Sequence, residues 1–267
     1  MNFRLYWYIM ALSLTLGPKK FLYRHQLVMV LVGNVITPED VVADPRYRRL
    51  KPKQVSLELL SQYTRELQGK FDFEAMRIIN TIKEEYGTGV CALVRIYNAS
   101  GKTITFKTRG PNWQGHMFKY PPDYTILNGQ WSVFLHVKTS ENASNSEATT
   151  NSVPTTSGVT ASGTTASGAT NSSGSQSSVV YNVDDVNQAI FLGWGVPTSP
   201  SELSSKVYTE VNSKNHWSTV TNWEAMLSKV NASRQLSVSF YSGINCTATI
   251  GDDTSPVVNY LAAYYSK

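Results

Sequence analysis

The stretch WSVFLHVKT, residues 131–139, alternates between apolar and other side chains over its whole length. A period of two residues predicts a β-strand, because successive side chains of an extended chain point to opposite faces. One face carries the larger apolar set: Trp131, Val133, Leu135 and Val137. Phe134 and His136 fall on the other face, and we interpret the histidine as a surface residue. The strand therefore predicts a half-buried β-sheet immediately before the tract that follows it.

A long polar tract, residues 139–178, begins where this strand ends. It is rich in Ser, Thr and Gly and too polar to bury a core, so we predict a disordered insertion. Predicted strands flank it directly, as they would flank a hairpin loop, and neither side of it has enough strands and helices for a core of its own. We therefore expect one β-domain, residues 88–267, that contains the tract as an insertion, in preference to two domains joined by a linker.

Alternation recurs on both sides of the tract. The segments VCALVRIY and KTITFKT, residues 90–97 and 102–108, surround the turn residues 98–101, and we interpret them as a β-hairpin. Five further strands are predicted after the tract: residues 178–183, 189–196, 236–243, 245–250 and 257–265. The predicted fold class is therefore mainly β, an antiparallel β-sandwich with N-terminal helices and one further helix.

Helical spacing precedes and interrupts these strands. Residues 55–68 carry apolar side chains three and four positions apart, and the segment FEAMRIINTIKEEY follows with Asp72 as its predicted cap. We expect residues 29–87 to form a helical segment packed on the sandwich. The further helix is TNWEAMLSKV, where Thr221 and Glu224 have the spacing of a capping box.

Residues 1–28 precede the predicted fold. Their apolar run LYWYIMALSLTL is too short to span a bilayer, and Pro18 spoils the nearest signal-cleavage site. We expect this segment to be an extension and the protein to be cytoplasmic; it would be secreted or membrane-associated if the run acts as a signal. Cys91 and Cys246 are then expected to be buried free thiols of a reducing compartment.

No nucleic acid, nucleotide, metal or cofactor is an expected partner. The formal net charge is +5, but the basic stretch at residues 46–53 is interpreted as a solvated loop, because no nucleic-acid motif accompanies it. YNASGKT, residues 97–103, imitates a phosphate-binding loop, yet Ile96 stands where the motif needs Gly and a strand follows where it needs a helix. The histidines lack zinc-site spacing and no nucleophile motif indicates an enzyme. An undetected hydrolase and a structural or storage protein without a ligand are the alternatives.

The segment RGPNWQGHMFKYPPDYTILNGQW, residues 109–131, gathers aromatic side chains beside amide and carboxylate groups. Aromatic faces stack on sugar rings or lipid headgroups while polar groups bond their edges, so we predict a ligand site here, with Trp113 stacking on the ligand. The predicted site residues are Trp113, Gln114, His116, Tyr120, Asp123 and Tyr124. The alternative is that the tryptophans fill the core, which we expect of Trp131.

Several segments carry a resemblance beyond composition: YNASGKTITFKTRGPNWQGH, NGQWSVFLHVKT, GWGVP, NHW, TNWEAML and IGDDTSP. Together they resemble the jasmonate-induced proteins of plants, over a region from about residue 29 to near the C-terminus. The resemblance implies a non-enzymatic, jasmonate-responsive stress or defence protein. A more distant likeness, in fold rather than motif, is to actinoporin-like β-sandwiches, which include fungal proteins that bind membrane sphingolipids. The expected ligand of the aromatic segment is therefore a membrane-lipid headgroup or a glycan.

Overall fold

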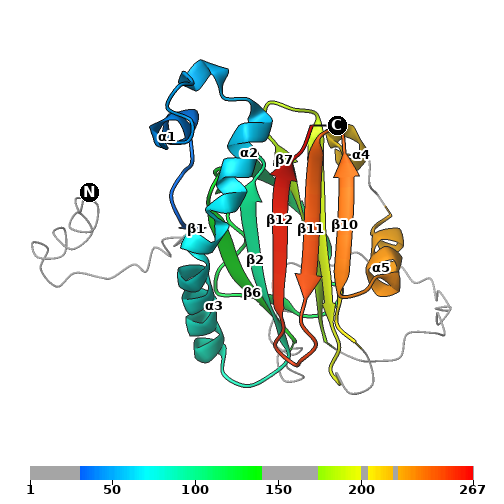
Figure 1. The fold of residues 1–267 in the computed structure, drawn as a ribbon. Helices are drawn as coiled ribbons and strands as arrows, with labels where there is room; N and C mark the ends of the chain where they lie inside the picture. The colour runs from blue at the N-terminus through cyan, green and yellow to red at the C-terminus, as the bar shows by residue number, and fades with distance from the viewer. Residues whose placement is uncertain (1–30, 140–173, 200–203, 219–221, 267) are drawn as a thin grey trace, which may run out of the picture.

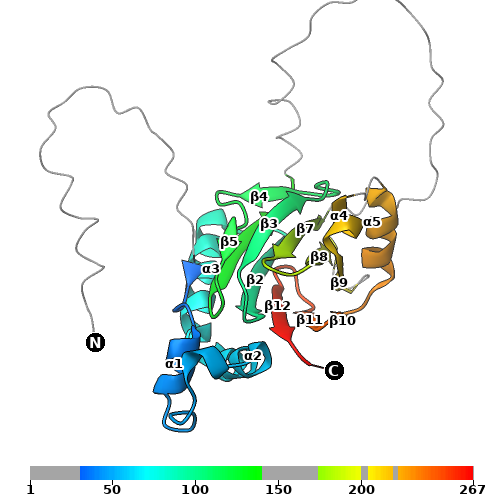
Figure 2. The ribbon, with the colours of Figure 1, turned by 90° about the horizontal axis from the view of Figure 1, so that it is seen from above.

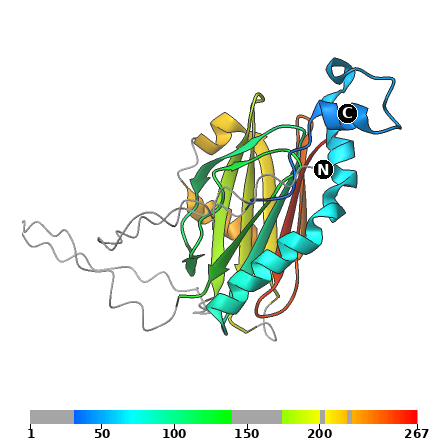
Figure 3. The same ribbon diagram turned by 90° about the vertical axis from the view of Figure 1, so that its left-hand side faces the viewer.

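The structure, a computed structural model, describes residues 31–139, 174–199, 204–218 and 222–266 (Figure 1). The expected extension, residues 1–28, and residues 140–173 of the expected insertion lie outside them. The described residues form two β-sheets packed face to face, with helices on both outer faces (Figure 3).

The first sheet has seven strands and the second has five. Across the first sheet the order is β1 (Leu31–Val32), β6 (Trp131–Val137), β2 (Cys91–Ala99), β12 (Val257–Tyr264), β11 (Ile244–Ile250) and β10 (Leu236–Tyr241), and β4 (His116–Phe118) also pairs with β6. Across the second it is β5 (Thr125–Ile126), β3 (Ile104–Arg109), β7 (Ser175–Val183), β8 (Gln188–Val196) and β9 (Lys206–Ser213). Among the described strands, only β2 and β12 pair in parallel. The predicted class, a mainly β antiparallel sandwich, is confirmed.

The predicted hairpin of β2 and β3 is wrong, because the two strands belong to different sheets. The buried Asn98 side chain replaces strand pairing at the turn: its Nδ2 donates to the carbonyls of Lys102 and Ile126, at 2.7 and 2.8 Å. Its Oδ1 accepts from the Ser100 amide at 3.0 Å. These bonds turn the chain from one sheet to the other. The strands on either side of the polar tract, β6 and β7, also lie in different sheets and form no hairpin.

The C-terminal limit of the expected insertion needs correction as well. Residues 175–178, counted within it, begin β7, pair with β8 and are nearly or fully buried. Small hydroxyl side chains can be buried when they find partners: Ser175 Oγ donates to the His136 carbonyl at 2.9 Å, and Ser177 Oγ to Asn112 Oδ1 at 3.2 Å. Polar composition therefore does not mark where the strand begins.

Helices cover each sheet on its outer face (Figures 2 and 3). On the first sheet lie α2 (Leu57–Glu66) and α3 (Asp72–Tyr86), both predicted; Ala75, Ile79 and Ile82 of α3 share a buried face. On the second lie α4 (Lys214–Ser218) and α5 (Trp223–Ala232). The periodicity did not predict α4, nor the remaining helical elements, α1 (Pro38–Ala43) and the 3-10 turns Pro52–Gln54 and Gln68–Lys70.

Two predicted caps differ from those observed. Asp72 is the first residue of α3, and Phe71 occupies the cap position. At α5 the cap is Asn222, whose side chain accepts from the Ala225 amide at 3.1 Å, and Thr221 lies outside the described residues.

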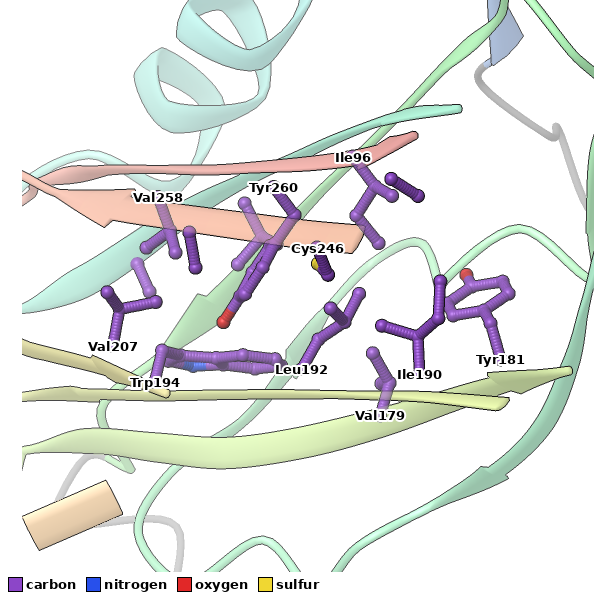
Figure 4. Close-up of a cluster of buried hydrophobic side chains, with 14 of the residues drawn as sticks. Ile96, Val179, Tyr181, Ile190, Leu192, Trp194, Val207, Cys246, Val258 and Tyr260 are labelled. Carbon is purple, nitrogen blue, oxygen red and sulfur yellow. The ribbon is translucent and has the colours of Figure 1, made fainter. Parts of the chain in front are cut away.

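The main core lies between the sheets and uses residues from before and after the polar tract (Figure 4). Its largest members are Trp194, Tyr181 and Tyr260, all fully buried. The tyrosines also satisfy their hydroxyls, because Tyr260 donates to the Gly193 carbonyl and Tyr181 to the Asp123 carbonyl, each at 2.8 Å. Cys91 and Cys246 are buried free thiols, as expected, and burial raises the pKa of Cys246 to about 12.

The sheets meet along one side, where β9 lies beside β10. Ser237 and Ser239 of β10 point inward, and their hydroxyl oxygens accept from the amides of Thr209 and Val211, at 3.1 and 2.8 Å. The serine side chains therefore bond to backbone amides on the edge of β9 that does not pair with another strand. Because side chains alternate along a strand, inward serines place Leu236 and Val238 on the outside.

Candidate functional site

The predicted aromatic site does not come together in the structure. Trp113 is half-buried and packs on the cluster of apolar residues between α5 and the second sheet. Gln114 forms backbone bonds with Gln176, and its side-chain oxygen accepts from the Gly174 amide at 2.9 Å. Both residues therefore contribute to the packing where β7 begins.

The other four predicted site residues lie elsewhere. Asp123 is 4% exposed and accepts from Ser132 Oγ at 2.5 Å, so its carboxylate is occupied inside the protein. Tyr120 packs on the cluster beneath α3, on the first sheet. His116 and Tyr124 are exposed on β4 and in the loop before β5. Tyr124, at 64% exposure, is the largest exposed apolar surface of this segment. Trp131 is a core residue, 1% exposed, as expected.

His136 is buried, so its interpretation as a surface residue is wrong. Both faces of β6 are covered, one by α3 and the other by the second sheet, and alternation cannot reveal this. His136 Nδ1 lies 2.8 Å from Ser175 Oγ, and its ring contacts Trp194 edge-on. Burial lowers the pKa of His136 to about 3, with smaller effects of His116 and Arg109. Both side chains are buried, and their contact joins β6 of the first sheet to β7 of the second.

An apolar strip on β10 faces outward instead. We define the apolar strip as Leu236, Val238 and Phe240, which are 60%, 58% and 42% exposed. Their neighbours across β11 are Thr249, Thr247 and Asn245, so the apolar side chains are concentrated on β10. β10 lies at the edge of the first sheet (Figure 1). Exposed apolar side chains that adjoin one another are typical of interaction surfaces.

An open groove runs alongside this strip, between β10 and the C-terminal end of α5. It has a volume of about 480 Å³. Tyr208 and Ser237 contribute from β9 and β10, Lys229 and Arg234 from α5 and the segment after it, and Leu236 with Val238 from the strip. We call this set the groove. It places cationic groups directly beside apolar ones.

Charges in the groove are unevenly paired. Glu210 accepts from Lys229 Nζ at 2.6 Å and from Tyr208 Oη at 2.8 Å. Burial, the largest single effect, would raise the pKa of Glu210, but these two bonds together with the charge of Lys229 and a bond from Asn212 lower the pKa overall. Lys229 is therefore neutralised by an ionised partner, whereas Arg234 is exposed and its guanidinium forms no ion pair or hydrogen bond within the described part of the chain.

Sequence reasoning missed this groove. The strand at residues 236–243 was predicted, but neither of its faces was proposed as a binding surface, and β9 was not predicted at all. A signal was present in LSVSFY, where serines alternate with apolar residues, and in Lys229 and Arg234 shortly before it. Among the described residues no group of side chains has the composition of a metal site, and no helix is long and apolar enough to cross a membrane.

The Nakanori-like protein family model matches residues 32–158 and 162–264, nearly the whole described chain. The chain belongs to the Nakanori-like family. It is 26% identical over 227 residues to the 23 kDa jasmonate-induced protein of Hordeum vulgare, covering 84% of this chain and 92% of that protein. The crystal structure of the lipid binding protein Nakanori matches with a TM-score of 0.70 and 26% identity, covering 88% of this chain and all of that one. The resemblance to jasmonate-induced proteins is confirmed, and the Nakanori-like family model spans both the aromatic segment and the groove.

Proposed function

We propose that this Nakanori-like chain is a non-enzymatic lipid-binding protein that attaches to membranes through the apolar strip of β10. The observation that carries the proposal is the exposure of three neighbouring apolar side chains on one strand at the edge of a sheet. Nakanori is itself described as a lipid binding protein, which supports a lipid ligand, and the jasmonate-induced relative supports a role in stress or defence.

The energetics favour membrane contact. Full burial of a Leu, Val or Phe side chain is worth about 1.5–3 kcal/mol, so even partial insertion of the strip would supply a useful part of a binding free energy. β10 pairs with β11 along its whole length. The side chains of the strip can therefore enter the membrane interface while the backbone groups of β10 that face β11 stay hydrogen-bonded.

A lipid fits the groove better than a glycan does. On the side of the strip the groove wall is aliphatic, formed by Leu236 and Val238, whereas sugar rings are usually bound against flat aromatic faces. The one aromatic residue in the described lining is Tyr208, and the Lys229 ammonium already lies over its ring, 5.9 Å from the centroid. We also propose a cytoplasmic location, which the two buried free thiols support because such thiols persist in reducing compartments.

Co-sedimentation with phosphatidylcholine vesicles tests the proposal. Val238→Asp should weaken vesicle binding at least about tenfold, because it places a charge in the strip, and should leave the fold intact because Val238 is 58% exposed. Phe73→Asp is the matched control: Phe73 is 81% exposed on α3, which covers strands at the opposite side of the same sheet. Equal losses in the two variants, or vesicle binding by Val238→Asp as strong as that of the wild type, would contradict attachment through β10.

A further inference from the structure

We propose that the groove binds the phosphate of an anionic phospholipid headgroup and that Arg234 is the residue that contacts it. This inference rests on the proposed function and deepens it, since it assigns a headgroup class to the surface beside the strip. The occupant is a lipid in a bilayer, with its phosphate in the groove and its acyl chains along Leu236 and Val238.

The distribution of charge singles out Arg234 among the cations of this region. Lys229 is held by Glu210 at 2.6 Å, and the ammonium of Lys206 donates to the Asn231 carbonyl at the end of α5. Arg234 has no such partner within the described residues. An exposed guanidinium presents a planar fork of donors that matches two phosphate oxygens at once, which a lysine cannot do.

The backbone at Arg234 is held in place. Its carbonyl accepts from the Val207 amide at 2.9 Å, which forms an isolated bridge between the chain after α5 and β9. The carbonyls at the C-terminus of a helix disfavour an anion, but at α5 one of them is occupied by the Lys206 ammonium, which offsets that effect. Arg234 thus extends from an anchored backbone position beyond the helix end.

The position of Arg234 relative to the strip indicates a lipid in preference to a soluble phosphate. Arg234 lies two residues before Leu236, at the end of the apolar strip, and both residues line the groove. A headgroup phosphate at Arg234 places the glycerol and the first acyl carbons beside Leu236 and Val238. A soluble phosphate ester would use only the charged half of this surface.

Vesicle composition separates this inference from the function on which it rests. Wild-type protein and Arg234→Gln are compared on phosphatidylcholine vesicles with and without phosphatidic acid. We expect Arg234→Gln to lose about tenfold in affinity for the anionic vesicles and clearly less on phosphatidylcholine alone, because the choline of that lipid already balances the charge of its phosphate. Arg234→Lys should recover part of the loss, because it restores the charge but not the fork.

Arg48→Gln is the control for charge alone, because Arg48 is exposed in the basic loop at residues 46–53 and its removal lowers the net charge equally. Equal losses for Arg48→Gln and Arg234→Gln would overturn the inference in favour of diffuse attraction. The inference would also be overturned if phosphatidic acid did not strengthen the binding of the wild-type protein. In that case, binding to phosphatidylcholine would still uphold the proposed function. Competition by glycerol 3-phosphate as effective as that by anionic vesicles would show a site for soluble phosphate esters and would also overturn it.

Discussion

The aromatic segment at residues 109–131 is less accessible to a ligand than its composition indicates, and the strand β10 is more accessible. The segment is crowded with aromatic and polar side chains, yet Trp131 is core and Asp123 is bonded internally. β10 has an ordinary alternating sequence, yet its apolar side chains face solvent. Composition shows what a side chain can bind, whereas the elements that cover each face decide whether it is available.

Coverage explains the difference. α3 lies over β6 and β2, and α2 over β12, so the apolar residues on the outer face are buried on β6 and β2 and partly buried on β12. β10 is at the opposite edge of the sheet from β6, and its inward positions are occupied by serines that bond to β9. An alternating strand is therefore buried on both faces at one side of this sheet and exposed on one face at the other.

The largest expected contrast is in stability. Trp131→Ala should lower the free energy of unfolding by about 3–5 kcal/mol, because it removes a fully buried indole between Tyr97 and Arg95. Leu236→Ala should cost less than about 0.5 kcal/mol, since that side chain is 60% exposed. Urea unfolding of the two variants measures both values. A cost at Leu236 comparable to that at Trp131 would show that the strip is structural.

A smaller effect concerns the pH dependence of stability and tests whether β6 is buried on both faces. Because the pKa of His136 falls from 6.5 in the unfolded chain to about 3 in the folded one, the fold favours the neutral imidazole. The contribution of the neutral His136 to the free energy of unfolding is fully present above pH 6.5 and is lost as the pH falls toward 3. Between pH 7.5 and pH 5 the loss should be about 2 kcal/mol.

His136→Gln is the control for this titration, because an amide can still bond to Ser175 but does not titrate in that range. Between pH 7.5 and pH 5 its free energy of unfolding should fall by about 2 kcal/mol less than that of the wild type, which is the loss assigned to His136. Parallel pH profiles for the two proteins would place the imidazole in contact with water and contradict its burial.

The sequence was sufficient for most elements of secondary structure and insufficient for their pairing. The periodicity of α3, and of β6 and β11, depends on local contacts that recur every three to four or every two residues. The crossing from β2 to β3 depends on Asn98 bonding to Ile126, which is remote in sequence. The direction of Leu236 depends on serines meeting β9, a strand whose sequence KVYTEVNS gave no prediction. Contacts between distant segments therefore account for both the error in topology and the missed groove.

The smallest expected effect separates the two regions as ligand sites. Trp113→Ala should lower stability by about 1–2 kcal/mol, because the half-buried indole packs on the cluster that includes Phe191 and Trp217. Its indole N–H is buried, so the polar edge of the ring does not face a ligand in solvent. Binding to vesicles should therefore stay within about twofold of the wild type when measured well below the unfolding temperature. The contrary result would be a folded Trp113→Ala protein whose vesicle binding falls at least about tenfold, the loss expected of Val238→Asp. That result would show that the aromatic segment binds the lipid, at the site that composition first indicated.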